Sequence, residues 1–69
     1  MRHFQVQIQN GETFSVDVED HNLGRFELAQ RAVEQLGFVN ARLRVAVNSV
    51  FKFVADGEGK AFNLKVWEC

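Results

Sequence analysis

The sequence has few of the residues and segments that build disulfides, membrane spans or secretion signals. Its single cysteine, Cys69, cannot form an internal disulfide, so the fold does not need an oxidising compartment. No apolar run is long enough to cross a bilayer, and the N-terminal residues lack the apolar region of a signal peptide. We therefore expect a cytoplasmic protein that does not associate with membranes.

Side chains that perform catalysis or hold metals are scarce as well. His3 and His21 are the only histidines, and no serine or cysteine has a predicted base beside it. The acidic residues 17–22 resemble part of a calcium loop, but that loop needs glycine where this chain has Asn22 and glutamate where it has Leu28. We expect no enzymatic activity, no metal site and no cofactor.

The length and composition predict one small folded domain over residues 1–69. An apolar fraction of 46% with seven phenylalanines is typical of a globular chain rather than a disordered one. The formal net charge of −1 is unevenly divided, because residues 1–21 carry −3 and residues 22–69 carry +2. A core this small gives a thin stability margin, which a homodimer would widen.

Helical periodicity is confined to residues 22–37. The apolar face of this predicted helix follows the i, i+3, i+7, i+10 spacing and consists of Phe26, Ala29, Val33 and Leu36. Asn22 is the expected N-cap, and Gly37 is the expected glycine just after the helix.

The rest of the chain alternates between apolar and polar residues, as half-buried strands do. The predicted inward rows, in chain order, are Phe4, Val6 and Ile8; Phe14, Val16 and Val18; Leu43, Val45 and Val47; Phe51, Phe53 and Ala55; and Phe62, Leu64 and Val66. For the first hairpin we expect a three-residue loop over residues 9–11, with Gly11 in the left-handed conformation, which pairs Val6 with Phe14.

These elements follow one another in the order β-β-α-β-β-β. Short connections between the last three strands favour a meander, so we expect an α+β domain with one helix packed on a five-stranded, mostly antiparallel sheet. A β-grasp arrangement begins with the same hairpin and helix and is the alternative. Neither topology by itself implies a function.

The sheet face turned away from the helix, which we call the open face, is the candidate partner-binding surface. Its predicted members are basic or apolar: Arg42, Arg44, Val50, Lys52, Val54, Lys65 and Trp67, with Ala46 also turned outward. Pairing Ala55 with Phe62 across the last hairpin would set Lys52 opposite Lys65, beside Trp67. Arginine and tryptophan are enriched at binding hot spots, and a lysine pair suits an anionic partner. The alternative is an ordinary solvated face.

Three functions are compatible with this surface. The first is a non-enzymatic protein-interaction module that acts as an adaptor or inhibitor. The second is nucleic-acid binding by the same face, with Trp67 and Phe38 stacking on bases. The third is a structural homodimer, formed by edge strands or by the patch of Val50, Val54 and Trp67.

Several segments resemble those of small bacteriophage anti-CRISPR proteins. They are the order of hairpin, helix and meander, Leu43-Arg44-Val45 entering the third strand, Asp56-Gly57 to Lys60 in the last turn, and Trp67-Glu68-Cys69 at the end. The resemblance spans most of the chain. It implies a phage-encoded stoichiometric inhibitor that binds a host defence or regulatory complex in the host cytoplasm, often through surfaces that guide or target nucleic acid would otherwise use.

Overall fold

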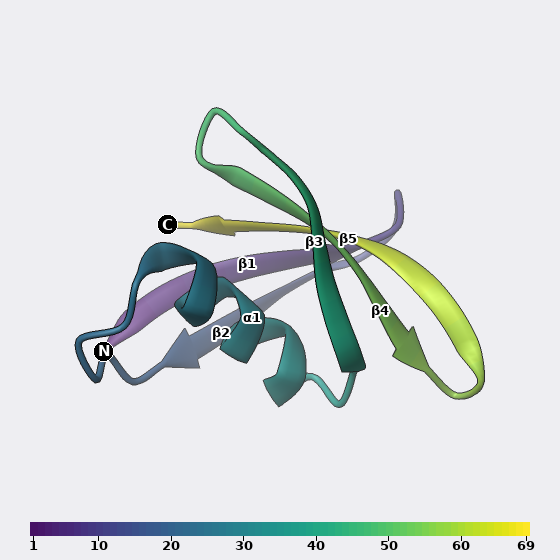
Figure 1. Ribbon diagram of the computed structural model, residues 1–69, viewed down its shortest axis with the longest axis horizontal. Helices are drawn as coiled ribbons and strands as arrows, with labels where there is room; N and C mark the ends of the chain where they lie inside the picture. The colour runs from purple at the N-terminus through teal and green to yellow at the C-terminus, as the bar shows by residue number, and fades with distance from the viewer.

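One helix lies across one face of a five-stranded antiparallel sheet in the computed structural model, which describes residues 1–69 (Figure 1). In chain order the elements are β1 (Arg2–Ile8), β2 (Thr13–Val18), α1 (Arg25–Gln35), β3 (Val39–Val47), β4 (Val50–Gly57) and β5 (Lys60–Glu68). The predicted α+β class and element order are confirmed. The single helix is too short and too polar to cross a membrane.

The sheet order is β2-β1-β5-β4-β3, and every neighbouring pair runs antiparallel. The strands β2 and β3 therefore form the two edges and run in the same direction, and α1 carries the chain from one edge to the other (Figure 1). A β-grasp fold needs its first and last strands to run parallel. Because β1 and β5 run antiparallel, the β-grasp alternative is wrong.

The core lies between α1 and the helix-facing side of the sheet. All twelve buried residues are apolar: Phe4, Val6, Val16, Val18, Leu28, Ala29, Ala32, Val33, Phe53, Ala55, Leu64 and Val66. The predicted helix face included Ala29 and Val33 but missed Leu28 and Ala32, which complete two adjacent i, i+4 rows. Phe26, at the margin of this face, is 39% exposed, yet its ring stacks 5.9 Å from that of Phe53.

The helix starts later than predicted. It begins at Arg25 with Gly24 as N-cap, so the prediction of Asn22 as N-cap is wrong. Asn22 instead adopts a left-handed conformation (φ 64°), and its backbone N–H donates to Asp20 Oδ1 at 2.9 Å. At the other end Gly37 (φ 97°) follows the C-cap as predicted, and its N–H donates to a carbonyl of the last turn at 2.9 Å.

The first hairpin has the predicted register but a different turn conformation. Val6 pairs with Phe14, and residues 9–11 form the three-residue loop. The left-handed residue is Gln9 (φ 55°), so the prediction that Gly11 adopts this conformation is wrong. The physical reason lies in the neighbouring strand, because the backbone N–H of Gln9 donates to the carbonyl of Asn63 in β5 at 2.6 Å.

The strand β3 contains two register shifts that strict alternation did not predict. The second shift, between Leu43 and Val45, changes which residues of β3 lie on the open face. Leu43 pairs with Phe53 and Val45 pairs with Lys52, which leaves Arg44 without a partner on β4. This is a β-bulge, in which two residues of one strand oppose one residue of the other.

Beyond the bulge, the faces of β3 are exchanged relative to the prediction. Val47 lies opposite Val50 and Ala46 lies opposite Phe51, so Val47 belongs to the open face and Ala46 to the helix side. The predicted inward row of β3 is therefore wrong at Val45 and Val47, and the outward placement of Ala46 is wrong as well. Val45 and Val47 are 43% and 49% exposed.

Candidate functional site

The pairing of β4 with β5 organises the centre of the open face. Lys52 lies directly opposite Lys65, and Val50 lies opposite Trp67, as the sequence predicted. The lysine row continues on both sides through residues of the neighbouring strands, Val45 on β3 and Gln7 on β1. No carboxylate lies in this row. Like charges directly opposite each other destabilise a sheet, so the lysine pair opposes folding in the free protein.

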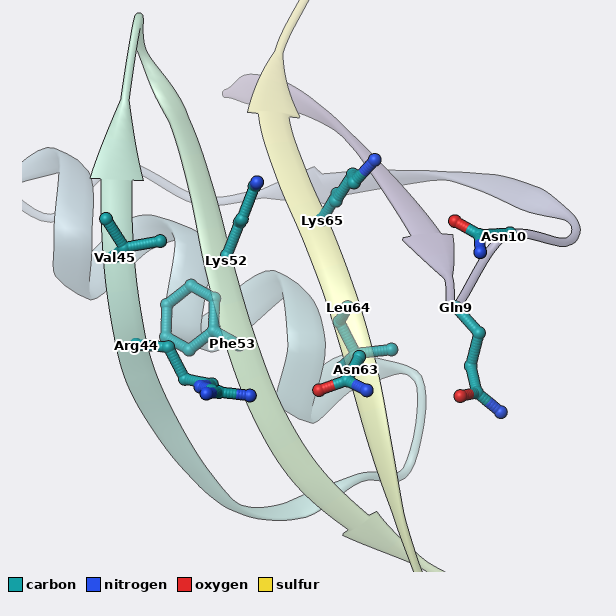
Figure 2. Close-up of a pocket in the computed structure, with 9 residues that line it drawn as sticks. All are labelled: Gln9, Asn10, Arg44, Val45, Lys52, Phe53, Asn63, Leu64 and Lys65. Carbon is teal, nitrogen blue, oxygen red and sulfur yellow. The ribbon is translucent and has the colours of Figure 1, made fainter.

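A cavity of about 480 Å³ opens on this face, and we call it the basic pocket (Figure 2). Its lining comes from β3, β4, β5 and the β1–β2 loop and consists of Gln9, Asn10, Arg44, Val45, Lys52, Phe53, Asn63, Leu64 and Lys65. The lining contains three cationic side chains and no acidic one. Phe53 and Leu64 also line it, although their side chains are buried in the core on the helix side of the sheet.

The cations of the basic pocket have no counter-ion in the protein. Ion pairs elsewhere join Arg2 to Asp20 and Glu68, His3 to Asp17, His21 to Glu19 and Arg42 to Asp56, and none involves Arg44, Lys52 or Lys65. Arg42 was predicted to act with these three cations. It lies outside the pocket, and its guanidinium is 3.5 Å from the Asp56 carboxylate, which offsets its charge.

An apolar patch lies beside the basic pocket. The patch combines two valines that the bulge turns outward, Val45 and Val47, with two residues predicted for this face, Val50 and Trp67. Val54, also predicted for this face, lies on the other side of the lysine row, between Arg42 and Asn63. Trp67 is half-buried between Val50 of β4 and Gln5 of β1, so it presents less ring surface than an exposed tryptophan would. Sequence alternation had no signal for the outward turn of Val45 and Val47.

Two of the acidic residues before the helix, Asp17 and Glu19, each contact one histidine. His3 Nδ1 lies 2.6 Å from Asp17 Oδ1, and His21 Nε2 lies 3.1 Å from Glu19 Oε2. No group of three or more histidine, cysteine or carboxylate side chains is placed to hold a metal ion.

Arg2 connects the two ends of the chain to the segment before α1. It donates to both carboxylate oxygens of Glu68, with Nη2 to Oε1 at 2.7 Å, and its Nη1 donates to Asp20 Oδ2 at 3.2 Å. The hydrogen bonds from Arg2 lower the pKa of Glu68 and, with a further bond from the Asn22 backbone N–H, the pKa of Asp20. They raise the pKa of Arg2 itself.

These pKa shifts predict an acid-sensitive contribution to stability. Because both carboxyls have a lower pKa in the folded protein, the unfolded chain takes up protons first as the pH falls. The contribution is complete above the ordinary carboxyl pKa and is lost as the pH falls through the lowered values. Replacing Arg2 with glutamine should flatten the acid limb of stability against pH, measured by urea unfolding from pH 6 to pH 2. An acid limb of unchanged slope would contradict this assignment.

Comparison of the chain with protein-family models, with curated proteins and with solved structures returns no match. The open face is therefore the surface from which a function can be inferred. There the sheet brings together three unpaired cations, three side-chain amides and an apolar patch, none of them covered by the helix.

Proposed function

We propose that this protein is a small non-enzymatic interaction module that binds a protein partner through its open face. The observation that supports the proposal is the position of the unpaired Arg44, Lys52 and Lys65 beside the apolar patch. Protein interfaces combine apolar surface with polar groups that pair across the contact, and this face offers both side by side. Arginine and tryptophan, both present here, are the residues that most often dominate its binding energy.

The charge distribution favours a protein partner over a long nucleic acid. Nucleic-acid affinity depends on many phosphate contacts, which a protein makes with an extended stripe of basic residues. On this sheet three of the four unpaired cations line one pocket and the fourth, Lys60, lies at the start of β5, while the Arg2 and Arg42 charges are offset by carboxylates. Trp67 is the only aromatic residue on the open face, and it is half-buried.

The shape of β3 argues against a homodimer built by pairing two β3 strands. Its two register shifts interrupt the regular ladder that a second copy would extend. Two β3 strands would also bring Arg42 and Arg44 of both copies together. A dimer that buries the apolar patch instead remains an outcome that light scattering would detect as a doubled mass.

The resemblance to small anti-CRISPR proteins extends this proposal. The partner would be a host defence or regulatory complex in the cytoplasm, and the module would act as its stoichiometric, phage-encoded inhibitor. The mechanism would be steric, since binding through an open sheet face needs no chemical step. The cationic centre of that face suits an acidic area of the partner.

The proposal is tested by affinity capture from bacterial lysate, with and without nuclease, using the wild type and the double variant Arg44→Glu with Trp67→Ala. The wild type should retain one stoichiometric protein in both conditions. The double variant should weaken retention at least about tenfold, since hot-spot residues each contribute about 2 kcal/mol or more.

The matched control is Arg31→Glu, which reverses one charge on the exposed side of α1. It should retain the partner as the wild type does. Circular dichroism of each variant confirms that the fold is intact. Equal retention by the double variant and the wild type would contradict a role for the open face, and retention that disappears with nuclease would favour nucleic acid.

A further inference from the structure

The basic pocket has the charge, size and donor groups of a site for a small phosphorylated ligand. We infer that it binds the diphosphate or triphosphate group of such a ligand. This goes beyond the proposed function and does not depend on it.

The donors of the pocket are free to take up an anion. Arg44, Lys52 and Lys65 form no ion pair, and no carboxylate lines the pocket to compete for them. The side-chain amides of the lining, those of Gln9, Asn10 and Asn63, take part in none of the protein's side-chain hydrogen bonds. Three positive charges match a multiply charged phosphate better than a single carboxylate.

The β-bulge brings the arginine into this position. Since Arg44 is the residue without a partner on β4, the bulge allows it to share the open face with Val45. In Figure 2 its side chain extends across β4 toward Asn63, while Lys52 and Lys65 extend side by side from the neighbouring strands. A guanidinium binds phosphate oxygens through two parallel hydrogen bonds, and the lysines add mobile point charges.

The confinement of the charge indicates a compact ligand. The pocket volume of about 480 Å³ lies within the range of small-molecule sites. The strands β1 and β2 add no free lysine or arginine beside the pocket, because their one such residue, Arg2, is paired with Asp20 and Glu68. A small phosphate group needs no cations beyond the pocket, whereas a polyanion that continued across the sheet would.

The opposed lysines predict that a bound phosphate also stabilises the fold. Their mutual repulsion is present in the free protein, and a bound phosphate would neutralise it. Ligand that binds only the folded state raises its stability by mass action. Pyrophosphate should therefore increase the thermal midpoint, whereas sodium chloride at the same ionic strength should increase it less.

The test is a titration of ¹⁵N-labelled protein with sodium pyrophosphate at low salt, followed by NMR. Saturable shifts are expected at the amides of Arg44, Lys52, Asn63 and Lys65. The double variant Arg44→Gln with Lys65→Gln should bind at least about tenfold more weakly. The control double variant Arg31→Gln with Lys60→Gln removes the same charge outside the pocket and should bind as the wild type does.

Equal weakening in both double variants, or shifts that do not saturate, would overturn the inference in favour of general charge screening. Two further ligands, a ten-residue glutamate peptide and a single-stranded thymidine oligonucleotide, are titrated in the same way. If either binds the pocket more tightly than pyrophosphate, the site belongs to an acidic protein or to nucleic acid and the inference is wrong. The two proposals can fail independently. If the lysate experiment captures no protein but the NMR titration shows saturable pyrophosphate binding, the proposed function fails and this inference stands.

Discussion

Replacing Phe53 with alanine is expected to destabilise the protein by about 3–5 kcal/mol, the range measured when a large buried aromatic is truncated. Phe53 is 1% exposed and lies in β4 between Leu43 on β3 and Leu64 on β5. Its ring also stacks on Phe26 of α1. Truncation therefore removes contacts within the sheet and between the sheet and the helix at the same point.

The expected loss from Phe53→Ala is large relative to the free energy of unfolding of the whole protein. A chain of 69 residues has a free energy of unfolding of about 3–10 kcal/mol, so the substitution should remove at least about a third of it. Urea unfolding followed by circular dichroism measures the difference. The control is Phe14→Ala, which truncates the same residue type at a 39% exposed position and should cost clearly less. A Phe53→Ala protein within 1 kcal/mol of the wild type would contradict the placement of this ring in the core.

Replacing Ala29 with leucine should destabilise the protein by about 1–3 kcal/mol through overpacking. Ala29 and Ala32 are fully buried on the face of α1 that meets the sheet, where small side chains let the helix approach closely. Three additional carbon atoms at this position have no free volume and must displace the helix or its neighbours. The loss would be seen as a lower urea midpoint with an unchanged slope.

The control for this substitution is Ala46→Leu in the edge strand β3. Ala46 is exposed although it is turned to the helix side, because the helix does not cover this part of the sheet. The extra carbons there should change stability by less than about 0.5 kcal/mol. If both leucine variants lost the same free energy of unfolding, the assignment of Ala29 to the packed core and Ala46 to the exposed edge would be contradicted.

Most strands could be predicted from the sequence because alternation and short turns constrain each other. In the first hairpin, a three-residue loop over residues 9–11 puts Phe4, Val6, Val16 and Val18 on the same face, and the structure adopts this register. The same reasoning pairs Lys52 with Lys65 in the last hairpin. Each of these predictions needs only residues that are close together in the chain.

The sequence was a poorer guide where a local rule competes with another interaction. Asn22 is a good N-cap residue, but the Asp20 side chain captures its backbone N–H and the helix begins three residues later. In β3, alternation assumes one residue per position, and the bulge at Arg44 breaks that assumption. Nothing in the sequence around Arg44 indicates a bulge.

In the candidate site, too, the residues placed by short-range pairing could be predicted and those placed by long-range contacts could not. All seven predicted residues lie on β3, β4 or β5, where short-range pairing could place them. The basic pocket also uses Gln9 and Asn10 from the first hairpin, which approach β5 only because β1 is its neighbour in the sheet. Strand order depends on contacts between distant residues, so these two members could not be found from local patterns.

The central position of β5 has a consequence for how the sheet assembles. The β1–β2 and β3–β4 hairpins share no ladder with each other, and β5 is the strand that joins them. Phe4 pairs with Val16 inside the first hairpin, but its second pairing, with Glu68, requires β5. We therefore expect the two hairpins to form as separate units during synthesis, and the sheet to close in one late, non-local step after the last strand has left the ribosome.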